Sequence, residues 1–390
     1  MKAIVFALLV AALPLGAKDL DLPDPLTTRS GEKVSSVELW QTKRRPEILE
    51  LFRENVYGRM PVRRPEKLQF EVTESTPEAL EGKATRKQVK IAYQGPGGEG
   101  AIRLVLFIPN DSPKPAPCFV LICNRGPENI DPTRKVKSPF WPAEQIVARG
   151  YAAAAFLNAD VALDKNVHFT NGVHRIFDPA DGRKADSWAT IAAWAWGASR
   201  VLDYLETDRA IDAKRVAVVG HSRGGKTALW AGAEDERFAM AVSNESGSTG
   251  AALARGKQGE RIRDINKTFP YWFCDNYKRY NDREEELPVD QHMLVGLMAP
   301  RLVYVASATE DAWSDPRNEF LAAVHAGPVY RLFGLQGLNT DVMPKAESPL
   351  QAGSIGYHLR TGKHNLTEYD WARFMDFADK HLRGSEPAKP

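Results

Sequence analysis

The chain has 390 residues, of which 43% are hydrophobic and 26% are charged, and this is the composition of an ordinary globular protein with a substantial core. Its 52 basic and 50 acidic residues give a net charge of +2, so charge gives no reason to expect nucleic acid or an anionic membrane as a partner. The three cysteines, Cys118, Cys123 and Cys274, exclude reliance on a disulfide framework, and no Cys/His spacing suggests a zinc site.

The first residues, MKAIVFALLVAALPLGAKD, predict a secretory signal peptide. Lys2 supplies a positive start, residues 3–13 are apolar, and Leu15-Gly16-Ala17 is a plausible cleavage site. An uncleaved membrane anchor is the alternative, although the apolar run is shorter than the roughly 20 residues of a spanning helix. We therefore expect a signal peptide at residues 1–17 and a single catalytic domain at 18–390. A secreted or periplasmic monomer without membrane contact follows from this interpretation.

The remaining chain predicts an antiparallel start followed by alternating strands and helices. Residues 18–45 are expected to be an extended lead-in, and 46–57 a helix with Pro46 in its first turn. Strands are expected at 87–93, 101–109, 118–123, 151–156, 215–220, 240–244, 301–307 and 328–334. Helices are expected at 186–206, capped by Asp186 or Ser187, and at 226–235, 315–326 and 366–382. Apolar strands alternating with helices indicate an α/β fold whose mostly parallel sheet is sandwiched by helices.

Gly220-His221-Ser222-Arg223-Gly224 lies between an expected strand and an expected helix. This is the G-x-S-x-G pattern in the strand–turn–helix context of the α/β-hydrolase nucleophile elbow. The turn strains the backbone at the nucleophile, so the flanking positions need glycine. It would place the Ser222 hydroxyl at a helix N-terminus, where the backbone N–H of Arg223 can stabilise a developing oxyanion. A purely structural glycine-rich turn is the alternative.

The α/β-hydrolase fold places a histidine base after the acid in the chain. His364 lies in the polar run Thr361–Asn365, between the last expected strand and the last helix, where the base belongs. His358 is its rival. His292 and His325 come before the last expected strand, and we expect them to be structural.

Two carboxylates follow expected strands and could orient this histidine. Glu245 comes directly after the strand at 240–244, and Asp311 follows the strand at 301–307, the usual position of the acid in this fold. Either could instead be a solvated carboxylate at the end of a loop. The sequence does not rank them.

Several longer motifs stand out along the chain: GHSRGGK (220–226), NESG (244–247), EDAW (310–313), GKH (362–364), YGRMP (57–61) and PYWFC (270–274). Together they resemble the motifs of the glucuronoyl esterases, which form carbohydrate esterase family fifteen, and in particular its bacterial branch. The motif GxSRxGK is much more specific than GxSxG, and the similarity covers nearly the whole mature chain. Fungal relatives carry disulfides that this chain lacks.

The resemblance implies an α/β-hydrolase that cleaves esters between (4-O-methyl-)glucuronic acid on xylan and lignin alcohols, with no metal or organic cofactor. The roles that it implies are Ser222 as nucleophile, His364 as base, Glu245 and Asp311 as acids, Arg223 at the oxyanion, and Lys226, Trp313 and, less securely, Glu260 as sugar contacts.

The two positive charges of the motif GHSRGGK suit a uronic ester as substrate. Such an ester has no free carboxylate until it is hydrolysed. Arg223 and Lys226 would lie where negative charge develops in the transition state and then in the product. Lys226 is one helical turn from Ser222, although an isolated lysine there would ordinarily be a solvated surface residue. Trp313 offers an apolar face for stacking on a sugar, with simple core packing as its alternative.

Two other functions remain open at this point. One is an acetyl xylan esterase or general carboxylesterase on the same fold. The other is a carbohydrate-binding protein with an inactive hydrolase scaffold, which the complete set of Ser, carboxylate and His candidates argues against.

Overall fold

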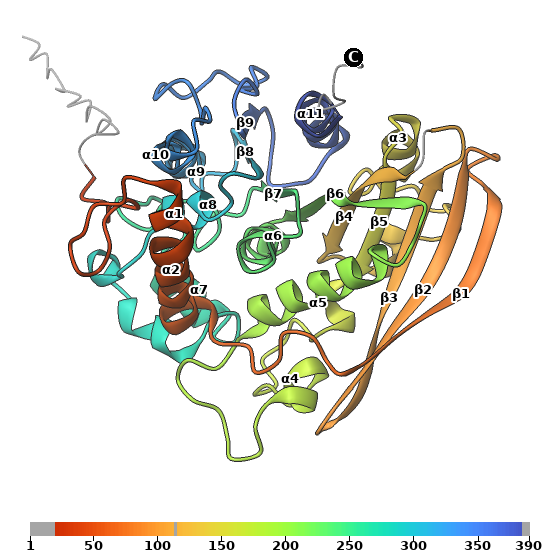
Figure 1. Cartoon of the computed structure of the whole chain (residues 1–390), viewed down its shortest axis with the longest axis horizontal. Helices are drawn as coiled ribbons and strands as arrows, with labels where there is room; N and C mark the ends of the chain where they lie inside the picture. Colours follow the sequence, from red (N-terminus) through yellow and green to blue (C-terminus); the bar gives the residue numbers. More distant parts are fainter. Residues whose placement is uncertain (1–19, 113–114, 384–390) are drawn as a thin grey trace, which may run out of the picture.

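The computed structural model describes residues 20–112 and 115–383, and its strands form one nine-stranded sheet in the order β1-β2-β3-β5-β4-β6-β7-β8-β9 (Figure 1). The pairs β1–β2, β2–β3 and β3–β5 are antiparallel, and all pairs from β5 across to β9 are parallel. The strands are β1 Lys67–Ala79, β2 Ala84–Gly95, β3 Gly98–Pro109, β4 Ala116–Cys123, β5 Ala152–Leu157, β6 Ile211–His221, β7 Met240–Asn244, β8 Leu302–Ala308 and β9 Ile355–Arg360.

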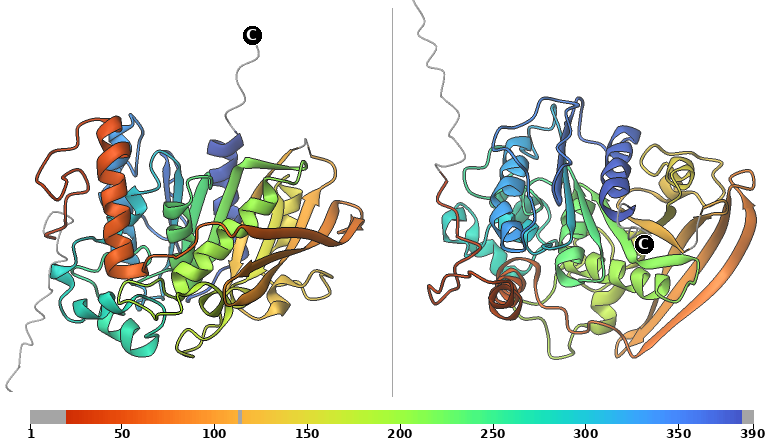
Figure 2. Two further views of the ribbon diagram at one scale, coloured as in Figure 1. Left: turned by 60° about the horizontal axis from the view of Figure 1, so that its bottom comes forward. Right: turned by 45° about the horizontal axis from the view of Figure 1, so that its top comes forward.

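Helices cover both faces of the parallel part of the sheet, while the long strands β1–β3 curl away at one edge (Figures 1 and 2). The α-helices are α1 Val37–Leu39, α2 Arg45–Phe52, α3 Ala143–Ala148, α4 Gly172–Phe177, α5 Thr190–Leu205, α6 Arg223–Glu234, α7 Ile262–Thr268, α8 Gln291–Gly296, α9 Pro316–His325, α10 Gly327–Leu332 and α11 Glu368–Ala378. The π-helical segments are η1 Trp40–Arg44, η2 Arg53–Tyr57 and η7 Asp379–Arg383, and the 3₁₀-helices are η3 Pro127–Ile130, η4 Asn158–Asp160, η5 Asp275–Tyr280 and η6 Glu284–Glu286.

The alternation of side chains along the buried strand β4 produces two cores. Cys118 and Val120 pack in the cluster formed with α5 and α6, whereas Phe119 and Cys123 pack in the cluster formed with α3 and α11. Every residue of β4 is buried. The expected α/β-hydrolase fold, with its mostly parallel sheet sandwiched by helices and its antiparallel start, is confirmed.

The N-terminal part of the chain differs from the expectation in two ways. Helical structure begins at Val37 instead of Pro46, because Ser36 caps it by accepting a hydrogen bond from the Leu39 N–H. The chain reaches Pro46 through the wide π-turn η1, whose i→i−5 hydrogen bonding avoids the clash that a proline causes in an α-helix. The predicted signal peptide at residues 1–17 lies outside the described residues.

The prediction of a strand at 328–334 is wrong, because this segment is helix α10. Pro328 suits the first turn of a helix, and Gly334, with φ of +70°, adopts the left-handed conformation common just after a helix end. The last strand is instead β9, which the sequence pattern does not predict because charged and polar side chains interrupt it. Strand β1 was also missed, since it is a largely exposed edge strand that tolerates Pro77.

The capping prediction for the long helix is also wrong. Helix α5 begins at Thr190, and the residue before it, Ala189, makes no side-chain cap. Asp186 forms an ion pair with Arg59 instead and accepts a backbone hydrogen bond from the same residue. In the described part of the chain, no helix is long and apolar enough to cross a membrane.

Candidate active site

Ser222 occupies the sharp turn between β6 and α6. Its backbone has φ of +56° and ψ of −123°, a strained conformation that an L-residue rarely adopts. Hydrogen bonds hold this conformation, since the Ser222 N–H donates to the Asn244 carbonyl at 2.9 Å and the Lys226 N–H donates to the Ser222 carbonyl at 3.1 Å. The Ser222 hydroxyl does not cap α6 and is partly exposed, so it is available for chemistry.

The glycines of the turn are required by its close backbone packing. A Cβ at Gly220 would lie 1.9 Å from the carbonyl oxygen of Gly224, which is backbone and cannot move aside. A Cβ at Gly225 would lie 2.9 Å from the Cβ of Ser246. The turn therefore has no room for a side chain at Gly220 or Gly225, which accounts for the glycine at each of these two positions.

His364 comes to this turn from the loop between β9 and α11, which is where the sequence predicts the base. Its ring centroid lies 4.4 Å from that of His221, the residue that precedes Ser222. His221 is itself buried, and its Nδ1 bonds the Asn244 side chain at 2.7 Å. Burial, and next the positive charge of His364, lower the pKa of His221 to about 3, so His221 stays neutral beside the imidazole of His364.

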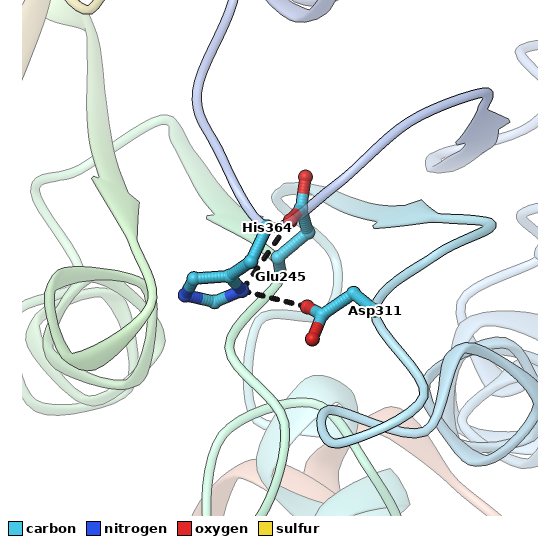
Figure 3. Close-up of side chains that lie close together, drawn as sticks. All are labelled: Glu245, Asp311 and His364. Atoms are coloured by element: carbon cyan, nitrogen blue, oxygen red, sulfur yellow. Dashed lines mark hydrogen bonds and ion pairs between the residues drawn. The ribbon is translucent and has the colours of Figure 1, made fainter.

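Asp311 and Glu245 both approach Nδ1 of His364 (Figure 3). The Asp311 Oδ2 accepts a hydrogen bond from Nδ1 at 2.6 Å, whereas the Glu245 Oε2 lies 3.4 Å from the same atom. Two carboxylates therefore share one imidazole N–H, and Asp311 makes the shorter contact. With Nδ1–H donated in this way, the neutral imidazole leaves Nε2 free to accept a proton.

The two carboxylates have different protonation behaviour because their surroundings differ. Burial raises the pKa of Glu245 to about 7, against the opposing effects of His364 and Arg360. Burial also opposes ionisation of Asp311, but hydrogen bonds from His364 and Ser314 outweigh it and lower the Asp311 pKa. Burial disfavours the His364 cation, yet hydrogen bonds and charge from Asp311 and then Glu245 raise its pKa to about 9.

Arg360, at the end of β9, organises this carboxylate cluster and is not among the residues predicted from the sequence. Its Nη2 donates to the Glu245 Oε1 at 2.6 Å and to the carbonyls of Lys363 and Asn365 at 2.7 and 2.8 Å. Its Nε lies 3.1 Å from both carboxylate oxygens of Asp370 on α11. A charged residue within the apolar run IGYHLR was the available signal, because a buried arginine needs carboxylate partners.

The rival His358 has a different environment. It is fully buried within β9, where Nε2 bonds Asp370 at 2.9 Å and Nδ1 bonds the Tyr304 hydroxyl at 3.1 Å. Burial lowers its pKa despite the neighbouring Asp370. Both ring nitrogens are occupied, so His358 is not available as a base. His292 and His325 lie together on α8 and α9, with ring centroids 6.2 Å apart.

Among the described residues, one group of potential metal ligands lies close together, and it is formed by Glu245, Asp311 and His364. Their ligand atoms lie within 4.8 Å of one another. Both oxygens of Glu245 already accept hydrogen bonds, one from Arg360 and one from the Asn365 N–H at 2.9 Å. The cluster is therefore organised around cationic and N–H donors, which suits an acid–histidine pair better than a metal ion.

Arg223 begins helix α6 and turns its guanidinium toward an aromatic pair. The guanidinium carbon lies 4.7 Å from the ring centroid of Trp272 and 5.2 Å from that of Phe269, and these two rings stack at 3.6 Å. Its Nη1 forms an ion pair with Asp164, which is also not among the residues predicted from the sequence. An acidic residue in a long loop carries no recognisable pattern, so only the fold could reveal this pairing.

Lys226 is buried beneath the elbow, contrary to the alternative of a solvated surface lysine. Its Nζ donates to the carbonyls of Ser246 and Ser248 at 2.6 and 2.5 Å, and it lies 3.7 Å from the Glu260 Oε2. Burial lowers the pKa of Lys226 to about 8, although Glu260 favours the cation. The structure therefore brings Lys226 and Glu260 together and makes the lysine easier to neutralise.

Trp313 lies beside this pair and is 57% exposed, which excludes core packing as the reason for an indole at this position. Its carbonyl accepts the Glu260 N–H at 3.0 Å, so the two predicted sugar contacts are adjacent. Gly259 permits this approach, because a Cβ there would lie 2.5 Å from the Trp313 carbonyl oxygen.

Comparisons with known proteins identify the family of the chain. A family profile described as glucuronyl esterase of fungi matches residues 139–334. A glucuronoyl esterase structure from Solibacter usitatus is 43% identical, covers 92% of this chain and 97% of its own, and superposes with a TM-score of 0.86. A promiscuous esterase of carbohydrate esterase family 15, from a marine bacterial metagenome, is 41% identical with a TM-score of 0.85, over 93% of this chain and 97% of its own. A 4-O-methyl-glucuronoyl methylesterase from Podospora anserina is 30% identical over 75% of this chain and 56% of its own length.

Proposed function

The chain belongs to the glucuronoyl esterases of carbohydrate esterase family 15, and we propose that it hydrolyses esters between (4-O-methyl-)glucuronic acid on xylan and the alcohol groups of lignin. The observation that carries the proposal is the 2.6 Å hydrogen bond from His364 to Asp311 beside the strained Ser222 turn. It supports a serine carboxylic-ester hydrolase in which acyl transfer needs neither a metal nor an organic cofactor.

In the first step, Nε2 of His364 removes the proton from the Ser222 hydroxyl as its oxygen attacks the ester carbonyl carbon. The carbonyl π-bond breaks to form a tetrahedral oxyanion, which the backbone N–H and the side chain of Arg223 stabilise at the N-terminus of α6. The C–O bond to the alcohol then breaks, and the leaving oxygen takes the proton from His364. A glucuronoyl ester of Ser222 remains.

In the second step, His364 removes a proton from water as the water oxygen attacks the acyl carbon and forms a second tetrahedral oxyanion. The bond from that carbon to the Ser222 Oγ then breaks, and Oγ takes the proton back from His364, which releases glucuronate and regenerates Ser222. Asp311 stabilises the imidazolium in both steps, and Glu245 supports it from 3.4 Å. The product carries a carboxylate that the ester lacks, so Arg223 and Lys226 complement the charge as it appears. Trp313 and Glu260 would hold the sugar ring by stacking and hydrogen bonding.

The direct test measures alcohol release from benzyl and methyl esters of glucuronic acid, with acetylated xylan and an aryl acetate as competing substrates. We expect the uronate esters to be strongly preferred and Ser222→Ala to lose more than about 1,000-fold in kcat. The second candidate function is a broad carboxylesterase, and it is worth testing because the marine relative is described as promiscuous. Equal activity on acetates and on uronate esters would favour it. Undiminished activity of Ser222→Ala would exclude the mechanism.

We also propose that the protein is exported, because residues 1–17 have the pattern of a signal peptide. N-terminal sequencing of protein recovered outside the cytoplasm should begin at Lys18. Recovery of the intact N-terminus in the membrane fraction would favour the anchor instead. A monomer in solution is the simplest arrangement, and light scattering would test it against the mass of one chain.

A further inference from the structure

Asp164 lies on the loop that follows β5 and η4, and its two carboxylate oxygens have different partners. Oδ1 accepts hydrogen bonds from the Tyr271 hydroxyl and from Nε1 of Trp272, each at 2.8 Å. Oδ2 accepts a charge-assisted hydrogen bond from Nη1 of Arg223. The aromatic donors fix the orientation of the carboxylate, and the second oxygen then fixes the guanidinium.

The loop itself is held in place on both sides of Asp164. The Ala162 carbonyl accepts a hydrogen bond from Nε1 of Trp194 on α5 at 2.8 Å, and the Leu163 N–H donates to the Asn171 side chain at 2.7 Å. Asp164 is therefore anchored through the fold and does not depend on Arg223 for its position.

Arg223 needs such an anchor because its side chain is long and starts at the turn that carries Ser222. An arginine free to rotate loses rotamer entropy when it meets an oxyanion, whereas a guanidinium that is already oriented does not. Stacking on Trp272 restricts the plane of the guanidinium, and Asp164 restricts its position. The negative charge of Asp164 would by itself disfavour an oxyanion, so its benefit must come through orientation.

We propose that Asp164 is a positioning residue, which holds the Arg223 side chain at the site where the oxyanion forms. This inference rests on the proposed function, in which Arg223 stabilises that oxyanion. A merely structural role for Asp164 is the competing explanation, because the buried Nε1–H of Trp272 needs an acceptor. The two explanations differ in what happens when Arg223 is absent.

The test is a double-mutant cycle on a benzyl glucuronate substrate, with Asp164→Asn, Arg223→Ala and both together. Asp164→Asn keeps the shape of the side chain and an oxygen for Trp272, but it loses the charge that holds Arg223. We expect it to lower kcat about 10- to 100-fold with KM within about threefold, because the oxyanion exists only after the chemistry begins. In the Arg223→Ala background, the same substitution should change kcat less than about twofold.

A matched control is Asp160→Asn, a similar change in the same segment, since Asp160 pairs with Arg103. It should leave kcat and KM unchanged. Asp164→Ala is the more severe second variant, and thermal unfolding reports whether either Asp164 variant is destabilised. The inference would be overturned if Asp164→Asn had wild-type kcat, or if it lowered kcat equally with and without Arg223. The proposed function would still stand in that case, provided that Ser222→Ala was inactive. Activity retained in Ser222→Ala would instead remove the basis of both.

Discussion

The shared contact of two carboxylates with Nδ1 of His364 predicts that they contribute unequally to catalysis. Asp311→Asn removes the charge that accepts the 2.6 Å hydrogen bond, whereas Glu245→Gln removes a charge 3.4 Å away. By Coulomb's law alone, the attraction at 3.4 Å is about three quarters of that at 2.6 Å. Arg360 further offsets the charge of Glu245 through a 2.6 Å hydrogen bond. Asp311 should therefore be the main acid.

These contacts set the expected size of each effect. Loss of the acid from a Ser-His-Asp triad without a replacement costs about 10⁴-fold in kcat. Because Glu245 remains beside His364, we expect Asp311→Asn to cost only about 10²-fold, and Glu245→Gln about tenfold or less. The double variant should approach the full 10⁴-fold loss, since no carboxylate would then orient the imidazole.

The pH dependence of kcat/KM gives an independent check. His364 acts as a base only when neutral, and Asp311 and Glu245 raise its pKa to about 9, so wild-type kcat/KM should rise with pH until about pH 9. Removing Asp311 removes stabilisation of the cation, which lowers the His364 pKa toward its ordinary value. In the Asp311→Asn variant, the rising limb of the plot of kcat/KM against pH should therefore move to lower pH. In the Glu245→Gln variant, the same limb should move less.

The assay is alcohol release from benzyl glucuronate at pH 5 to 10, with thermal unfolding of each variant as a control for folding. A larger loss of kcat in Glu245→Gln than in Asp311→Asn would refute Asp311 as the main acid. If the rising limb of kcat/KM with pH were unchanged in the double variant, its assignment to His364 would be refuted.

Three further substitutions, the first with a matched control, test the turn and the sugar site. Gly220→Ala should lower the free energy of unfolding, measured in urea, by more than about 2 kcal/mol, because its Cβ would lie 1.9 Å from the Gly224 carbonyl oxygen. The control Gly327→Ala should lower it by less than about 1 kcal/mol, because the new Cβ meets only the flexible end of the Arg331 side chain. Trp313→Ala should raise KM for glucuronate esters about tenfold without changing thermal stability or aryl acetate hydrolysis, and an unchanged KM would contradict sugar stacking. Lys226→Met should weaken inhibition by free glucuronate at least about fivefold. Because burial lowers the Lys226 pKa to about 8, wild-type inhibition should fade above pH 8, and persistence at pH 10 would contradict this role.

The sequence allowed the elbow and the histidine to be placed because both depend on strong local or topological constraints. Gly220 is required by a backbone contact with Gly224, four residues away, so this part of the motif is explained by its own local geometry. His364 was found through the chain order of the fold, even though the strand before it was misplaced. That strand, β9, was missed because His358 and Arg360 are polar yet buried, and their partners come from α11.

The relation between Glu245 and Asp311 could not be predicted, because it depends on differences of less than 1 Å between side chains from neighbouring strands. Asp164 was beyond prediction for a similar reason. Its partners Arg223 and Trp272 are 59 and 108 residues away, and an acidic residue in a polar loop carries no local sign of them. Helix α10 was wrongly predicted as a strand for a different reason. A short apolar run has the same sequence pattern in a strand and in a buried helix, so the pattern does not distinguish them.

The most direct test of the account is covalent modification by a fluorophosphonate, followed by peptide mapping and a parallel measurement of esterase activity. A reactive hydroxyl activated by His364 predicts one phosphonyl group per chain, located on Ser222, with activity lost in proportion to labelling and no labelling of Ser222→Ala. Full labelling with unchanged hydrolysis of glucuronate esters, or complete inactivation with Ser222 unmodified, would contradict it.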